Sequence, residues 1–364
     1  MRPQYAIPPL AILVAVLSAV PWLTSDYGLS LMVNLMSYVV LTIGWALFSG
    51  TTRLVSLATS AFYGVGMYTV AVLVKVLPLY AIFGVAALTG AAIAFIVGML
   101  TLRISGMFFV IFGFGLSEMM RQLTIWWEIN QTHTMGRYVR VAFDTTMIYE
   151  HLLGLGVIVF LTGWWLRRSR LGIALLVIGD DETVARQVGI NVPVCKVVIF
   201  VVSAVFMTLT GAVMAPRFGF INPNFAFSPL ISFQVVIMAF LGGLQRLWGP
   251  VLGIIPLVVM SEWLQVEYPF WFSVLLGLAF MVIVYFVPQG ITGVLENAWN
   301  WLGRPMTLQR GLIGPLLDAG AWLARPALVA YAWLSRPLWL PRGIAGAIEE
   351  AWFSVVGRPP EKRR

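Results

Sequence analysis

Long apolar stretches separated by short polar connections are the feature that most constrains the fold of this chain. About ten stretches approach the roughly 20 apolar residues that a helix needs to cross a hydrocarbon core. They cover residues 7–23, 29–50, 54–75, 79–101, 104–126, 151–166, 196–215, 230–244, 249–266 and 270–288. The stretches at 151–166 and 230–244 are short for a span. Because lipid offers no partner for unpaired backbone groups, the pattern predicts an all-α, multi-pass membrane protein.

Composition narrows the class of function. Hydrophobic residues make up 60% of the chain and charged residues only 10%, far from a soluble average. The single cysteine, Cys195, excludes a disulfide framework and a multi-cysteine metal site. We find no phosphate-binding loop, dinucleotide fingerprint, metal-ligand spacing or nucleophile–base pair. We therefore expect no enzyme activity, no ATP hydrolysis by this chain and no cofactor.

The basic residues indicate how the chain is oriented. If the N-terminus is inside and each stretch crosses once, the inside connections hold Arg2, Arg53, Arg103, Arg167, Arg168, Arg170, Arg186, Lys196 and Arg246. The outside connections hold Lys75, Arg121, Arg137, Arg140 and Arg217. This excess of inside charge predicts that both termini are cytoplasmic. In a chain this apolar, arginine-rich connections are a simpler explanation of the net charge of +8 than a nucleic-acid partner.

The polar connection between residues 167 and 196 carries the signals of a short helix. Asp180 is a suitable N-cap, Asp181 and Glu182 add negative charge to the first turn, and Gly189 suits the position after the helix. We expect this helix to be exposed on the cytoplasmic face. It is either a docking element for a soluble partner or an ordinary solvated loop helix.

Two further patterns lie inside the apolar stretches. Glu118 and Arg121 are three residues apart, so they share a helix face and form either a structural pair or a solute contact. Paired glycines permit close helix packing or broken helices that line a path. The candidate path residues are Gly64, Gly66, Glu118, Gly242 and Gly243. Because Gly249-Pro250 follows it, Gly242-Gly243 is the strongest candidate for a helix break.

Several motifs together carry a family resemblance. They are Ser56-Leu57, AFYGVGMYT at 61–69, Leu102-Arg103 through Glu118 to Arg121, DETVARQVGIN at 181–191, Gly211-Ala212, GFINP at 219–223, LGGL at 241–244, LWGPVLG at 247–253 and PQG at 288–290. Over residues 30–292 the chain resembles the membrane subunits of branched-chain amino acid ABC importers, the LivM type. The resemblance implies a permease domain at 1–292 in the bacterial inner membrane.

What the resemblance implies for partners is a half-channel that needs other subunits. These are a second permease subunit, two cytoplasmic ABC ATPase subunits and a periplasmic solute-binding protein, besides membrane lipid. The short cytoplasmic helix would couple the chain to an ATPase. The coupling residues would be Asp181, Glu182, Ala185, Arg186 and Gly189.

The solute stays open at this stage. The chain departs from the family pattern at Ala46, Arg53, Leu54, Ala58, Thr59 and at Gly179, where an arginine is usual. The stretch at 220–223 is equally at home in the related urea permeases. A branched-chain amino acid permease is our main reading, and a urea or amide permease is the alternative. A stand-alone carrier or channel would be expected to hold more intramembrane charges.

Residues 293–364 lie outside the resemblance. They combine recurring tryptophans with arginine–proline pairs, and the prolines interrupt any long helix. We expect a cytoplasmic or membrane-surface extension built of short amphipathic helices.

Overall fold

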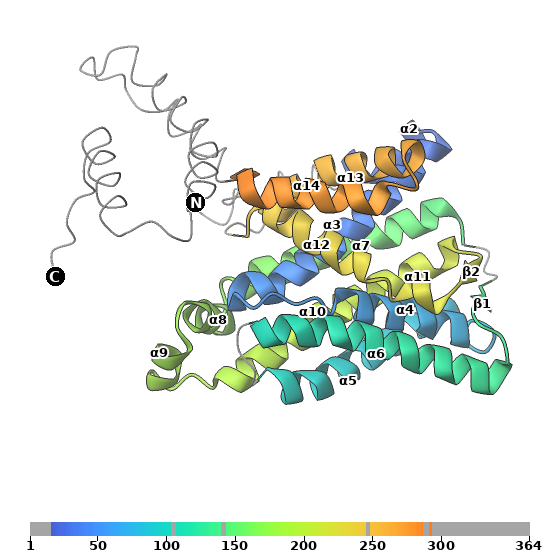
Figure 1. The fold of residues 1–364 in the computed structure, drawn as a ribbon. Helices are drawn as coiled ribbons and strands as arrows, with labels where there is room; N and C mark the ends of the chain where they lie inside the picture. Colours follow the sequence, from blue (N-terminus) through green and yellow to red (C-terminus); the bar gives the residue numbers. More distant parts are fainter. Residues whose placement is uncertain (1–15, 103–106, 140–142, 245–247, 287–290, 293–364) are drawn as a thin grey trace, which may run out of the picture. The chain divides into compact units, whose positions relative to one another are not determined.

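A computed structural model describes residues 16–102, 107–139, 143–244, 248–286 and 291–292. In the first half it contains helices α2 (Val20–Leu23), α3 (Asp26–Thr52), α4 (Thr59–Leu73), α5 (Leu79–Thr101), α6 (Met107–Thr132) and α7 (Thr145–Leu166), with strand β1 (Arg137–Tyr138). The second half contains α8 (Arg170–Asp180), α9 (Glu182–Gln187), α10 (Val192–Met214), the 3-10 turn η2 (Ala215–Arg217), β2 (Phe220–Ile221), α11 (Pro223–Ala226), α12 (Pro229–Gly242), α13 (Gly249–Glu267) and α14 (Phe272–Phe286). The predicted all-α membrane fold is confirmed (Figure 1).

Seven of the described helices are long and apolar enough to cross a membrane. They are Asp26–Thr52, Leu79–Thr101, Phe108–Thr132, Thr145–Leu166, Val192–Arg217, Pro223–Gly242 and Gly249–Glu267. Helices α4 and α14 are shorter, at 15 residues each. The first apolar stretch, 7–23, lies mostly outside the described residues, as does the extension at 293–364.

The structure corrects three of the expected boundaries. The stretch at 151–166 extends back to Thr145, where the Asp144 carboxylate accepts a hydrogen bond from the Thr145 N–H. Hydropathy missed this turn because it contains polar residues. The stretch at 230–244 becomes a 20-residue span once α11 is counted with α12. The stretch at 54–75 is longer than the helix it predicts, since α4 begins only at Thr59.

Helix α4 begins inside the protein. Its 15 residues extend about 22 Å, less than the roughly 30 Å of a hydrocarbon core. The Ser60 N–H donates to the Ser232 hydroxyl at 2.9 Å, and the Ser60 hydroxyl donates to that of Ser117. The Trp45 indole N–H donates to the Ser56 carbonyl at 2.7 Å. These bonds satisfy polar groups of the irregular backbone that leads into α4. Such backbone is tolerated in a membrane protein where it is buried in protein rather than exposed to lipid.

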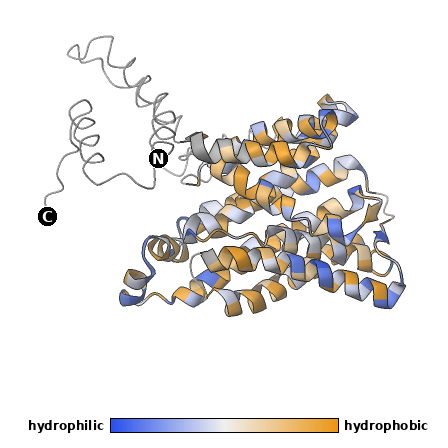
Figure 2. Ribbon diagram, viewed as in Figure 1, coloured by the Kyte–Doolittle hydropathy of each residue, from blue (hydrophilic) through white to orange (hydrophobic). Residues whose placement is uncertain are grey.

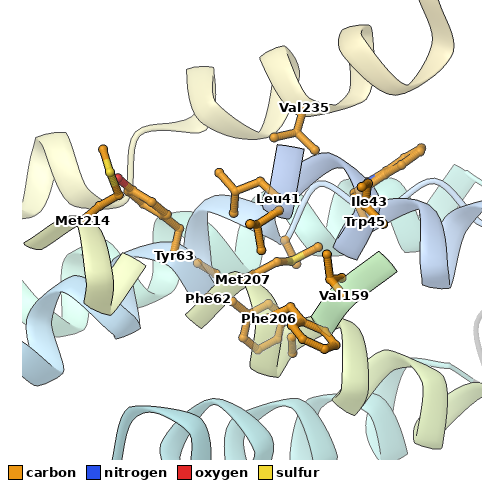
Figure 3. Close-up of a cluster of buried hydrophobic side chains, with 14 of the residues drawn as sticks. Leu41, Ile43, Trp45, Phe62, Tyr63, Val159, Phe206, Met207, Met214 and Val235 are labelled. Carbon is orange, nitrogen blue, oxygen red and sulfur yellow. The ribbon is translucent and has the colours of Figure 1, made fainter. Parts of the chain in front are cut away.

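Helix α10 packs against α3, α4, α5 and α7, and much of the core gathers around it. Figure 3 shows side chains from α3, α4 and α10 interleaving, among them Trp45, Phe62, Phe206 and Met207. The long helices carry many exposed apolar side chains, and much of their ribbon has the orange of hydrophobic residues in Figure 2. A water-soluble protein would not expose so much apolar surface, so these side chains suit contact with lipid.

Two ends of the helical domain carry different structures (Figure 1). At one end α8 and α9 form a short helical pair. At the other, β1 pairs antiparallel with β2, with Arg137 opposite Ile221 and Tyr138 opposite Phe220. This pairing joins the α6–α7 connection to the α10–α11 connection, which the sequence analysis did not foresee.

Candidate coupling and translocation sites

The short helix predicted near residue 180 is present, but it begins one residue later than expected. Asp181, not Asp180, is its N-cap, and the Asp181 backbone is extended between α8 and α9. Asp180 instead ends α8 and pairs with Arg53 at 2.5 Å. Gly179 explains this arrangement, because a Cβ there would lie 2.4 Å from the Thr51 carbonyl oxygen. Helix α8 therefore crosses the end of α3 closely at Gly179, where an arginine side chain would not fit.

Both ends of α9 are fixed by local hydrogen bonds. The Asp181 carboxylate accepts from the backbone N–H groups of Thr183 (2.7 Å) and Val184 (3.3 Å), which holds the pKa of Asp181 below its ordinary value. Gly189 has φ +86° and donates to the Arg186 carbonyl, while Ile190 donates to the Ala185 carbonyl. This pair of bonds is a Schellman motif. The prediction that Gly189 ends the helix is confirmed.

Two of the five expected coupling residues, Glu182 and Ala185, make contacts within the chain. Ala185 is fully buried, so it packs against the chain itself. Glu182 forms ion pairs with Lys196 and, at 3.7 Å, with Arg186. The Lys196 side chain is only 1% exposed, whereas the sequence analysis placed this residue in a polar inside connection. Glu182 and Ala185 therefore hold α9 in place within the chain.

The outward face of α9 carries two apolar residues that the sequence analysis did not select. Val184 is 47% exposed and Val188, the C-cap, is 73% exposed. Their spacing of four residues places them on one face. Arg186 and Gln187 are also exposed. The four-residue spacing of these two valines was the sequence signal that could have predicted this face.

Glu118 and Arg121 form the predicted pair on α6. The Arg121 guanidinium donates to both carboxylate oxygens of Glu118, one bond measuring 2.9 Å from Nε. It also donates to the side chain of Asn224 on α11, and Gln122 donates to Glu118 at 3.1 Å. Both charged groups are partly exposed. The pair thus ties α6 to α11, and its contact with a solute remains a prediction.

Three of the four candidate path glycines lie at tight contacts, and the fourth has a positive φ. A Cβ on Gly64 would lie 2.3 Å from the Phe227 ring, and one on Gly66 would lie 1.9 Å from the Thr208 carbonyl oxygen. A Cβ on Gly242 would lie 2.2 Å from the Gly249 carbonyl oxygen. Gly243 has φ +92° and follows the last residue of α12, so the predicted helix break is confirmed. Close packing accounts for Gly64, Gly66 and Gly242 in this conformation.

The structure separates these path candidates into two groups. Gly64 contacts Phe227 just before α12, and Glu118 is tied through Arg121 to α11. Gly242 and Gly243 lie at the far end of the 14-residue α12, about 20 Å away along the helix. A path lined by all five would have to run along α12, and this remains a prediction.

Sequence analysis missed several charged residues within helices. Besides Glu118 and Arg121, three such residues lie within the described helices, each within two turns of a helix end. Glu128 is fully buried in the last turns of α6, and Lys196 is buried in the first turns of α10. Glu262 lies within α13, in the apolar stretch predicted at 249–266. Among the described residues, no group of three or more His, Cys, Asp or Glu side chains could hold a metal ion.

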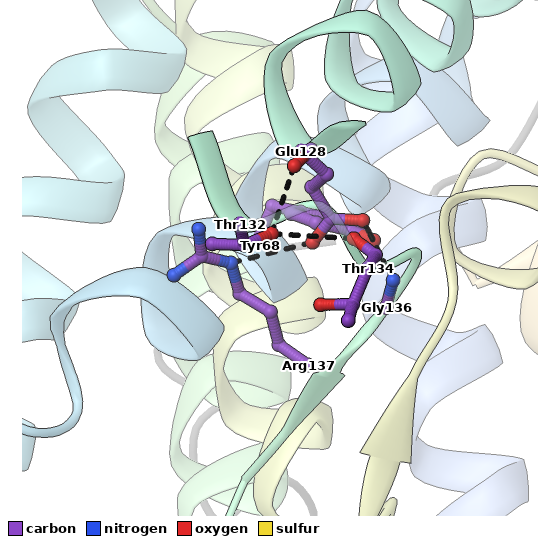
Figure 4. Close-up of polar contacts among 6 residues, drawn as sticks. All are labelled: Tyr68, Glu128, Thr132, Thr134, Gly136 and Arg137. Carbon is purple, nitrogen blue, oxygen red and sulfur yellow. Dashed lines mark hydrogen bonds and ion pairs between the residues drawn. The ribbon is translucent and has the colours of Figure 1, made fainter. Parts of the chain in front are cut away.

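Glu128 organises the end of the molecule that carries β1 (Figure 4). Its carboxylate accepts from the Gly136 N–H at 2.7 Å, the Arg137 guanidinium at 3.3 Å and the Tyr68 hydroxyl at 3.5 Å. Arg137 also lies 4.7 Å above the Trp127 ring. The buried carboxylate thus has a cationic partner and further donors, as its burial requires.

Comparison with known proteins identifies the family. The chain is 25% identical over 320 residues to the high-affinity branched-chain amino acid transport system permease protein LivM of Salmonella typhimurium, covering 78% of this chain and 74% of that protein. It is 26% identical over 316 residues to the LivM protein of Escherichia coli, with the same coverage. No solved structure matches the chain. Residues 27–285 match the family described as branched-chain amino acid transport system / permease component, and the chain therefore belongs to that permease family.

Proposed function

We propose that this chain is a membrane subunit of an ATP-driven importer that carries branched-chain amino acids across the bacterial inner membrane. In that assembly it pairs with a second permease subunit, receives solute from a periplasmic binding protein and is driven by two cytoplasmic ATPase subunits. Family membership supports the transport class. The observation that carries the coupling role is the exposed Val184–Val188 face of α9.

Helix α9 is suited to transmit force because three constraints hold it. The Asp181 cap fixes its start, and the Gly189 motif fixes its end. The Glu182–Lys196 ion pair ties it to α10, the helix that contacts α3, α4 and α5. A push on Val184 and Val188 would therefore reach the centre of the membrane domain. A six-residue helix without these ties would fray, because an isolated helix of this length is unstable in water.

The test is to replace both exposed valines of α9 by aspartate, as Val184→Asp with Val188→Asp. Burying two carboxylates in an apolar groove is costly, so we expect loss of ATPase co-purification and at least tenfold lower uptake and solute-stimulated ATP hydrolysis, with normal insertion. Val76→Asp is the matched control, since Val76 is 76% exposed in the α4–α5 connection. Normal uptake by the double variant would remove α9 from the coupling role. Uptake by the wild-type chain without any ATPase would instead indicate a stand-alone carrier.

For orientation, we propose that the α8–α9 end faces the cytoplasm and that both termini are cytoplasmic. Arg53 and Arg186 lie with α8 and α9, whereas Arg137 and Arg217 lie next to β1 and β2. This grouping agrees with the excess of basic residues expected inside. Reporter fusions at Gly28 and after Gly290 should report opposite sides of the membrane. Reporters on the same side would show that the number of crossings is wrong.

A further inference from the structure

A cluster of polar and charged side chains lies where α3, α12, α13 and the end of α10 meet. Arg217, the last residue of η2, donates to the Ser30 carbonyl at 3.3 Å, to the Ser30 hydroxyl at 2.6 Å and to the Asn34 amide oxygen at 3.1 Å. The Asn34 amide nitrogen donates to the Glu262 carboxylate at 3.2 Å. This last bond joins two residues that are 228 positions apart in the sequence.

The Asn34 amide holds a cation and an anion apart. Among the described residues, the ion pairs do not include one between Arg217 and Glu262. Asn34 instead stands between them, accepting from Arg217 and donating to Glu262. A direct pair would neutralise both groups. A spaced pair leaves each of them able to bind a further group of opposite charge.

Both charged groups retain hydrogen-bonding capacity. A guanidinium has five N–H donors and a carboxylate has about four acceptor positions. Arg217 makes three hydrogen bonds, and Glu262 accepts one from Asn34. Arg217 and Glu262 are both only partly buried.

We propose that this cluster binds the main-chain groups of an α-amino acid, with Arg217 holding the carboxylate and Glu262 holding the ammonium. The inference rests on the proposed function and names the solute class for it. An α-amino acid carries its two charges on adjacent positions, which matches a cation and an anion separated by one amide. Urea carries neither charge, so the cluster distinguishes the two candidate solutes. Arg217 lies three residues before β2, at the end proposed to face the periplasm.

A place for the solute side chain lies beside the cluster. The contact between α12, α13 and α14 is lined by Gln234, Ile237, Met238, Leu257, Ser261 and Leu276. Ser261 directly precedes Glu262, and Gln234 accepts a hydrogen bond from Tyr38. The remaining walls are aliphatic, which suits a branched apolar side chain. These side chains are packed against one another in this conformation, so a solute side chain can enter only if the helices move apart.

The test measures binding of three probes to the purified permease–ATPase complex without its solute-binding protein. The probes are L-leucine, 4-methylpentanoate, which lacks the ammonium, and 3-methylbutylamine, which lacks the carboxylate. Glu262→Gln should weaken leucine and the amine at least tenfold while leaving 4-methylpentanoate within twofold, because a charge-assisted bond is lost only for the ammonium. Arg217→Gln should weaken leucine and 4-methylpentanoate but not the amine. Glu267→Gln, an exposed carboxylate on the same helix, is the matched control and should change nothing.

The outcomes separate this inference from the proposed function. If all three probes weaken equally in Glu262→Gln, the residue is only structural and the inference is overturned. The same follows if wild-type uptake of leucine is intact but Glu262→Gln and Glu267→Gln bind it alike. If the wild-type complex neither takes up leucine nor hydrolyses ATP in response to it, the proposed function fails first. Should Glu262→Gln not insert, Arg217→Gln and Asn34→Ala decide the matter with the same probes.

Discussion

The two ends of the helical domain each contain one buried charged side chain, but with opposite signs and different support. At the β1 end the buried group is the Glu128 carboxylate, which accepts from Tyr68, Gly136 and Arg137. At the α9 end the buried group is the Lys196 ammonium, which pairs with the partly exposed Glu182.

This difference shows two ways of attaching a connection to a membrane domain. Glu128 gathers donors from α4, from the loop and from β1, so it fixes the whole α6–β1 connection. Lys196 secures one side of a short helix and leaves Val184 and Val188 uncovered. The first arrangement closes an end of the molecule, and the second presents a helix to a partner.

The largest effect should come from breaking the β1 end with Glu128→Ala. The change leaves the Gly136 N–H and the Arg137 guanidinium without their acceptor, and we expect a loss of about 3 kcal/mol in the free energy of unfolding. Denaturant unfolding in mixed micelles would measure this loss. Glu150→Ala, an exposed carboxylate near the start of α7, is the control. Equal midpoints for the two variants would show that Glu128 does not hold the connection.

A smaller, local effect should follow from Gly189→Val at the α9 end. Nothing lies within 4 Å of a Cβ at Gly189, so the cost comes only from its φ of +86°. A β-branched residue in this conformation costs about 1–3 kcal/mol, and we expect faster hydrogen exchange over residues 182–190 together with weaker solute-stimulated ATP hydrolysis. Gly189→Asn should behave nearly like the wild type, because asparagine tolerates this conformation. Similar losses in both variants would argue against a backbone effect.

The smallest effect concerns the Asp181 cap and appears only in acid. The pKa of Asp181 is lowered by the N–H groups of Thr183 and Val184, so the cap is fully formed above the ordinary value of 3.8 and is lost as the pH falls through the lowered folded value. Hydrogen exchange of the Thr183 and Val184 amides should therefore show protection that declines below about pH 4. Asp181→Asn keeps a capping oxygen without a titrating group. If this variant shows the same acid dependence, another group is responsible.

Local spacing explains which features the sequence could predict. The end of α9 at Gly189, the Glu118–Arg121 pair and the break after Gly242 each depend on residues close in the chain. The start of α9 was missed by one residue because Asp180 and Asp181 are both good caps. Helix α8 continues to Asp180, where Gly179 lies against Thr51. Thr51 belongs to α3, a helix distant in the sequence, so this contact could not be predicted from local spacing.

The sequence by itself determined the membrane class and the transport family, because the length of apolar stretches and short motifs can be recognised without knowing which residues are in contact. Only the tertiary structure decided that Ala185 faces inward, that Glu128 and Lys196 are buried and that α4 begins inside the protein. It alone joined Asn34 to Arg217 and Glu262, which lie 183 and 228 residues further along the chain. The physical reason is that burial and charge pairing depend on which helices meet, and hydropathy treats each helix separately.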